Sequence, residues 1–320
     1  IIIVPKIIAI AGTVLFCLFS ATSLINSDKN FSTQCSINRD FEIYDFKKII
    51  ERVDALESPT EANIAYRTIA LDQTGKLTKN LFQITPNRAS DIDPYKRHLA
   101  DFCLYSGSSN DALLHAMNNH LSLGYSFCNI KTMAIAYLLN GEIEPAKKMI
   151  KLLSQGIFYK EWAEQVSAAM KDPEVFFKKF PQYQKTKKGS FKNVVLINES
   201  DNIFEMYDRT IPQSPVHFER LLLSKLYLRD IDAFSEWMLR MASLGVKDYQ
   251  KAMPECFQEA ACLCALKGNP VIINNFPVTS QIRERVQKFA KLKQDGDSEE
   301  EIAKKMGRSY LTYFFFAPIE

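Results

Sequence analysis

Two pairs of helical segments share one spacing of apolar residues, and this recurrence constrains the fold most strongly. In each pair, the second helix carries apolar or small residues at offsets 0, 3, 6, 7 and 10 from its first residue. These offsets form one stripe along an α-helix, and a neighbouring helix must cover that stripe. The stripes consist of Ile143, Ala146, Met149, Ile150 and Leu153, and of Ile231, Phe234, Trp237, Met238 and Met241. The recurrence predicts helical hairpins that stack side by side.

Other features of the sequence also favour helices. The chain of 320 residues contains only 11 glycines, which are few for a fold with many tight β-turns. Several helix starts are marked by a capping side chain followed by proline, or by a capping serine with Glu three residues later. These signals are Ser58-Pro59, Asp93-Pro94, Asp172-Pro173, Ser214-Pro215, Ser58 with Glu61, and Ser298 with Glu301. We therefore predict an all-α chain.

The first helix pair resembles a tetratricopeptide repeat. The residues that match the family pattern are Ala134, Tyr137, Gly141, Ala146 and Ile150. Two positions depart from it: Phe158 stands where the family often has proline, and Phe234 replaces the small residue in the second pair. The resemblance implies an α-solenoid whose concave face binds a peptide or protein segment. A generic helical hairpin is the alternative.

The whole layout also looks like the C-terminal part of an uncharacterised bacterial family of multi-pass membrane proteins with a tetratricopeptide-like domain. The short matching segments are Gly75–Leu77, Leu81–Phe82, Gly156–Tyr159, Trp162–Ala163 and Tyr310–Phe316. This resemblance implies a location in the bacterial inner membrane and no particular activity. The first residue is Ile1 rather than Met, so we expect the chain to begin inside a longer polypeptide.

The segment from Ile7 to Ile25 is uncharged and mostly apolar. As a helix it would measure ~28 Å, close to the thickness of a bilayer's hydrocarbon core. We expect a transmembrane helix here, with a signal peptide after Lys6, a lipoprotein signal ending at Cys17 and a buried core helix as alternatives. The flanking charges do not fix the orientation, although we favour an extracytoplasmic position for the rest of the chain.

The chain divides into segments of different character. The segment 181–211 lacks helical periodicity, and its two short apolar runs could form a β-hairpin or an irregular loop. These runs are Val194–Ile197 and Ile203–Met206. The expected organisation is a transmembrane helix at 1–26, a linker at 27–40, a helical repeat sub-array at 41–180, a basic linker loop at 181–211 and a second helical sub-array at 212–320.

The sequence contains none of the common catalytic motifs. Gly-rich phosphate loops, nucleophile elbows, zinc-binding helices and paired C-x-x-C motifs are absent. His115 and His120 are five residues apart on one predicted helix, which places them on different faces and disfavours a shared metal. The net charge of +3 gives no general reason to expect nucleic acid as a partner. We predict no catalytic residues, no cofactor and no metal, and we favour a binding protein over an enzyme.

Polar residues on the first helices of two pairs are the candidates for partner binding. We expect them to be exposed on the concave face, where basic groups suit an acidic peptide or a C-terminal carboxylate. The candidates are Asn129, Lys131, Thr132, Arg220, Ser224 and Lys225. A separate candidate surface for anions, including lipid head groups, consists of Lys185, Lys187 and Lys188 in the basic loop. Ordinary solvated surface is the alternative for both sets.

These observations favour a membrane-tethered helical-repeat scaffold for protein or peptide interaction. Two alternatives stay open: a regulatory or substrate-capturing domain of a multi-pass membrane transporter, and an α-helical enzyme acting on glycan or lipid.

Overall fold

The computed structural model describes residues 12–16, 29–84, 96–191, 204, 207, 214–245, 249 and 251–317. Every regular element within these residues is a helix, so the predicted all-α class is confirmed. The first half contains α2 (Lys29–Glu42), α3 (Phe46–Asp54), α4 (Glu61–Gln73), α5 (Leu77–Asn80), η1 (Leu81–Gln83), α6 (His98–Tyr105), α7 (Ser109–Leu123), α8 (Phe127–Asn140), α9 (Ile143–Leu153), α10 (Lys160–Ala169), α11 (Pro173–Lys179) and α12 (Pro181–Lys188). The second half contains α14 (Pro215–Tyr227), α15 (Ile231–Ser243), α16 (Glu255–Leu266), α17 (Val271–Asn275), α18 (Ser280–Gln294), α19 (Glu299–Met306) and α20 (Tyr310–Phe316).

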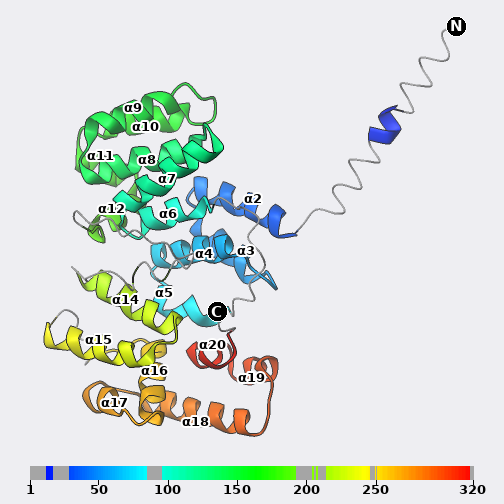
Figure 1. Ribbon diagram of the computed structural model, residues 1–320, viewed down its shortest axis with the longest axis vertical. Helices are drawn as coiled ribbons and strands as arrows, with labels where there is room; N and C mark the ends of the chain where they lie inside the picture. Colours follow the sequence, from blue (N-terminus) through cyan, green and yellow to red (C-terminus); the bar gives the residue numbers. More distant parts are fainter. Residues whose placement is uncertain are drawn as a thin grey trace.

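Helices that follow one another in the chain pack together as hairpins (Figure 1). The predicted pair of α8 and α9 forms such a hairpin, with Ala134 and Ala146 fully buried. Gly141 ends α8 at a backbone φ of +83°, a left-handed conformation that glycine adopts at little steric cost. The spacing in the sequence therefore predicted this hairpin and its turn.

The second apolar stripe lies on α15 and packs less uniformly than expected. Phe234, Met238 and Met241 are fully buried. Trp237 is only partly buried: its ring meets Phe218 edge to face at 6.2 Å. The expectation that Trp237 lies inside the helical array is therefore only half right, because its outer side stays open to solvent.

Most of the predicted helix starts that can be checked are correct. The side chains of Asp172, Ser214 and Ser298 each accept hydrogen bonds from backbone amides in the first turn of α11, α14 and α19. Ser58 is not a cap, because α4 begins later: Thr60 caps it and forms a reciprocal capping box with Asn63. The signal Asp93-Pro94 lies outside the described residues.

Two predicted linkers are wrong where the structure describes them. Most of the expected linker 27–40 lies within α2, whose Ile37 is fully buried against the neighbouring helices. The expected basic loop begins with α12, which holds Tyr183 in the aromatic core beside Tyr105, at a ring distance of 5.9 Å. α12 has only eight residues, and each helix has few buried apolar positions, Ile37 and Phe41 on α2 and Tyr183 on α12, so the sequence displays little helical periodicity there. The two runs predicted as a possible hairpin fall almost entirely outside the described residues.

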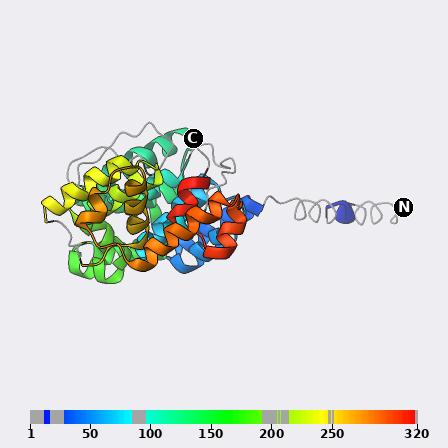
Figure 2. The ribbon, with the colours of Figure 1, turned by 90° about the horizontal axis from the view of Figure 1, so that it is seen from below.

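The two halves of the chain pack directly on each other. The first half lies above the second in Figure 1, and Figure 2 shows the second half in front. The returning C-terminal helix α20 packs on η1, where Phe82 meets Tyr310 and Tyr313 at ring distances of 4.9 and 5.0 Å. The described helices from α2 to α20 therefore form one continuous assembly.

The predicted transmembrane helix at 7–25 lies mostly outside the described residues. Residues 12–16 are helical. Among the helices that the structure describes, none combines the length and the apolar character needed to cross a bilayer.

Candidate ligand cavity

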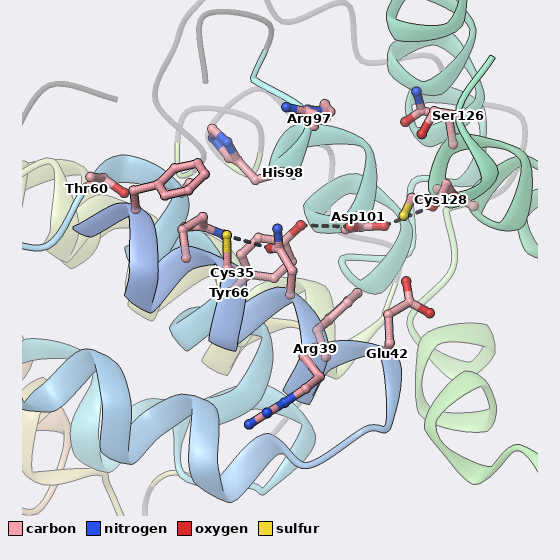
Figure 3. A pocket seen from close by; sticks show the side chains of 17 residues that line it. Cys35, Arg39, Glu42, Thr60, Tyr66, Arg97, His98, Asp101, Ser126 and Cys128 are labelled. Atoms are coloured by element: carbon pink, nitrogen blue, oxygen red, sulfur yellow. Dashed lines mark hydrogen bonds between the residues drawn. The ribbon is translucent and has the colours of Figure 1, made fainter. Parts of the chain in front are cut away.

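A cavity of about 500 Å³ lies between α2, α4, α6 and α8 (Figure 3). Its walls combine aromatic rings with many polar side chains. The lining residues are Phe31, Gln34, Cys35, Asn38, Arg39, Phe41 and Glu42 of α2; Thr60, Ala62 and Tyr66 at the start and within α4; Arg97, His98 and Asp101 at the start and within α6; and Ser126, Cys128, Asn129 and Thr132 at the start and within α8. This volume lies within the range of small-molecule sites in proteins.

Asp101 is one of two acidic residues that line this cavity, the other being Glu42. It is three residues after His98 on α6, so both side chains point to the same side of the helix. The carboxylate accepts a hydrogen bond from the Tyr66 hydroxyl at 3.0 Å and another from the Thr132 hydroxyl at 2.9 Å. Figure 3 shows Tyr66, Asp101 and Cys128 close together, whereas Arg39 points away from them. Hydroxyl groups from two other walls therefore fix the orientation of the carboxylate.

The position of Asp101 changes its acidity. Removal from bulk water raises the pKa of Asp101 to about 6, although the hydrogen bonds from Thr132 and Tyr66 act in the opposite direction. The group is therefore mostly ionised at pH 7 and changes its charge only slightly below neutral pH. A carboxylate of this kind costs the folded state free energy, because a neutral group would be easier to bury.

Lys131, a buried basic residue beside the cavity, forms an ion pair with Glu42 and not with Asp101. Lys131 lies on α8 beside the cavity, and its ammonium group contacts a Glu42 carboxylate oxygen at 2.5 Å. The rings of Tyr44, Trp162 and Tyr159 surround this ammonium at 5.1, 5.5 and 5.9 Å, within the range of cation–π attraction. In the described part of the chain, no basic side chain forms an ion pair with Asp101.

Two further side chains define what the cavity can do. Asn129 is buried, with 4% of its surface exposed, and its amide nitrogen has no hydrogen-bond partner among the described residues. Although part of the Cys128 side chain is exposed, neighbouring atoms partly desolvate its thiol and raise its pKa, and the sulfur lies 3.3 Å from the Tyr159 hydroxyl. The thiol is therefore neutral at pH 7 and a poor nucleophile. Within the described ranges, no cluster of His, Cys, Asp and Glu could hold a metal ion.

The six predicted partner-binding residues are buried, so their expected exposure is wrong. Helices α8 and α14 are covered on several sides, which leaves their polar residues to pair within the protein. Lys131 binds Glu42, Arg220 binds Asp72, and Ser224 donates to the Phe204 carbonyl at 2.5 Å. Lys225 is buried within α14. Of these six residues, Asn129 and Thr132 line the cavity. Their predicted role in binding a partner stays a prediction.

Two of the three lysines predicted as an anion-binding surface bond to the protein. The Lys185 ammonium donates to the backbone carbonyl of Asp72 and lies 3.5 Å from its carboxylate. The Lys187 ammonium donates to the Leu139 carbonyl, while Lys188 is exposed. The structure therefore does not present these lysines as one free basic cluster.

The sequence analysis missed Asp101 and Tyr66. A signal was available: Asp101 interrupts the apolar run of Leu99 to Tyr105, and an acidic residue in such a run must be paired, protonated or functional. The partners Tyr66 and Thr132 lie on other helices, and nothing in their local sequence connects them to Asp101.

Comparison with known proteins places the chain in a family without assigning a reaction. No curated protein matches it. Residues 1–317 match the description "Family of unknown function (DUF6057)", which covers nearly the whole chain. The chain therefore belongs to this family of unknown function.

Proposed function

We propose that this chain is a helical binding domain that holds part of a peptide or protein partner in the cavity between α2, α4, α6 and α8. The observation that carries the proposal is the lining itself: polar groups from four helices converge on a space of about 500 Å³, and the Asn129 amide nitrogen has no hydrogen-bond partner among the described residues. Such a volume accommodates one or two residues of a peptide, not a whole helix. The apolar segment 7–25 would tether this binding domain to a membrane.

A small glycan is the second candidate occupant. Phe31, Phe41 and Tyr66 provide aromatic surface, and Gln34 and Asn38 add polar groups at the same cavity. This combination suits a sugar ring, which has apolar faces and a polar edge. The same pocket would also suit the substrate-capturing domain of a transporter.

A cavity-filling substitution tests the proposal. Cys35→Trp places a large ring in the cavity, and Ser32→Trp places the same ring one turn earlier on α2, at an exposed position outside the lining. A phage-displayed library of seven-residue peptides and a panel of soluble oligosaccharides would be screened against both variants and the native chain. We expect peptides that bind the native chain and the Ser32→Trp variant but not the Cys35→Trp variant. Saccharides with that pattern would favour the second candidate, and the absence of any cavity-dependent binder would contradict both.

A further inference from the structure

We propose that the group held in the cavity is a protonated amine, which pairs with Asp101. This inference rests on the proposed function and adds the chemistry of the ligand. Its first support is the charge balance of the inner groups. Among the lining residues, Asp101 and Glu42 are acidic, and Arg39 and Arg97 are basic but exposed to solvent. Lys131, beside the cavity, forms its ion pair with Glu42. Asp101 is therefore the inner carboxylate that forms no ion pair with a described side chain, and a ligand cation would balance its charge.

The geometry of the Asp101 carboxylate leaves acceptor capacity for the ligand. One oxygen accepts from the Tyr66 hydroxyl and the other from the Thr132 hydroxyl. An ionised carboxylate offers about four acceptor positions, so about two remain. An ammonium group has three donors and no acceptor, which complements a carboxylate that is already held in place.

The aromatic walls also suit a cation. Phe41 and Tyr66 both line the cavity, with ring centroids 4.9 Å apart in an edge-to-face arrangement. The protein already binds one ammonium in this way, since Lys131 combines the Glu42 carboxylate with the rings of Tyr44 and Trp162. The cavity offers a second carboxylate, Asp101, beside the Tyr66 ring, and no described side chain forms an ion pair with it.

Other charged and titratable groups face Asp101 or the same space from each wall. They are Cys35, Arg39 and Glu42 on α2, Tyr66 on α4, Arg97 and His98 at α6, and Cys128 and Lys131 on α8. The two arginines are exposed to solvent, where salt and water weaken their repulsion of a cation. An imidazole ordinarily changes charge in the same pH range as Asp101, so a His98 variant serves as the control.

The first experiment compares a charged ligand with its neutral derivative. The probes are 2-phenylethylamine and N-acetyl-2-phenylethylamine, and binding to the whole chain is measured by calorimetry at pH 7. We expect the amine to bind about tenfold more tightly, because only the amine carries a charge for Asp101. Asp101→Asn keeps the shape of the side chain and should abolish the preference. Equal binding of the two probes by the native chain, or no binding of the amine, would overturn the inference.

The second experiment uses the native chain alone and does not depend on a variant that folds. Asp101, with a pKa of about 6, is mostly ionised at pH 7 and mostly protonated at pH 5. Binding of the amine should therefore weaken about tenfold between pH 7 and pH 5, while binding of the N-acetyl compound stays constant. His98→Gln should keep this pH dependence, and its loss in that variant would count against Asp101.

The proposed function and this inference can fail separately. Peptides that bind in a Cys35-dependent way, but equally well with a free or an acetylated N-terminus and without lysine, would preserve the proposed function and overturn the amine. A chain that binds no cavity-dependent ligand would overturn both.

Discussion

The cavity and the seam between α14 and the layer of α4 and α6 both enclose charged groups, but they differ in how the central carboxylate is balanced: Asp72 in the seam pairs with Arg220, whereas Asp101 in the cavity forms no ion pair with a described side chain. In the seam, the Arg220 guanidinium donates to the Ser106 carbonyl at 2.6 Å and to the Asp72 carboxylate at 3.2 Å. In the cavity, Asp101 receives hydrogen bonds from two hydroxyl groups and no ion pair from a described side chain. Breaking a buried ion pair lowers the free energy of unfolding, because it leaves an unpaired charge inside the protein. A buried carboxylate without a counter-ion already lowers the free energy of unfolding, and proteins retain such groups mainly where function requires them. We interpret the seam as structural and the cavity as functional on this difference.

The largest expected effect is the loss of the seam. Arg220→Met should lower the free energy of unfolding by about 3–5 kcal/mol, because it removes the donor to the Ser106 and Tyr105 carbonyls and leaves the Asp72 carboxylate with Lys185 alone. Chemical denaturation of the whole chain measures this loss. Arg240→Met is the matched control, since Arg240 is exposed and rests on the Trp237 ring at 4.8 Å, and it should cost at most about 1 kcal/mol. Equal losses for the two variants would remove the distinction between seam and surface.

In the cavity we expect a substitution to raise the free energy of unfolding instead of lowering it. Asp101→Asn should raise the free energy of unfolding at pH 7 by about 1–3 kcal/mol, because the neutral amide avoids the cost of burying charge that raises the pKa of Asp101 to about 6. The hydroxyls of Tyr66 and Thr132 can rotate to donate or accept as the amide requires. Denaturation and amine binding are measured on the same samples. A variant that is both less stable and unchanged in binding would show that Asp101 is structural.

The cost of burying the Asp101 charge should also make the stability of the native chain depend on pH, although this effect is smaller. The pKa of Asp101 in the folded chain lies above its ordinary value of 3.8, so the folded state holds this proton more tightly than the unfolded state. The resulting stabilisation is complete below about pH 4 and is lost as the pH rises through 6. Between pH 7 and pH 5, the native chain should gain about 1 kcal/mol relative to Asp101→Asn. Parallel pH profiles of the two proteins would refute the assignment of the titrating group.

The smallest effect is expected on α12. Lys188→Gln should change the free energy of unfolding by less than about 0.5 kcal/mol, because Lys188 is exposed. Lys185→Gln should cost slightly more, about 0.5–1 kcal/mol, since the Lys185 ammonium pairs with the Asp72 carboxylate that also binds Arg220. Thermal unfolding of the two variants checks the order, and a larger loss for Lys188→Gln would contradict it.

The sequence predicted the features that depend on near neighbours in the chain. The hairpin at Gly141, the buried stripes at Ala146 and Phe234, and the caps at Asp172 and Ser298 all follow from residues within one or two helical turns. Ser58 was misread because Thr60, two residues later, caps α4 in its place.

The sequence by itself determined the all-α class, the pairing of successive helices and most of the helix starts, because these depend on periodicity and on local hydrogen bonds. The tertiary structure decided which polar residues are exposed, and therefore where the candidate site lies. Lys131 and Arg220 look like free basic groups in the sequence, and only packing brings Glu42 and Asp72 to them. Asp101 becomes a candidate ligand-binding group for the reverse reason: the fold surrounds it with two hydroxyl groups and an open cavity, and no described side chain forms an ion pair with it.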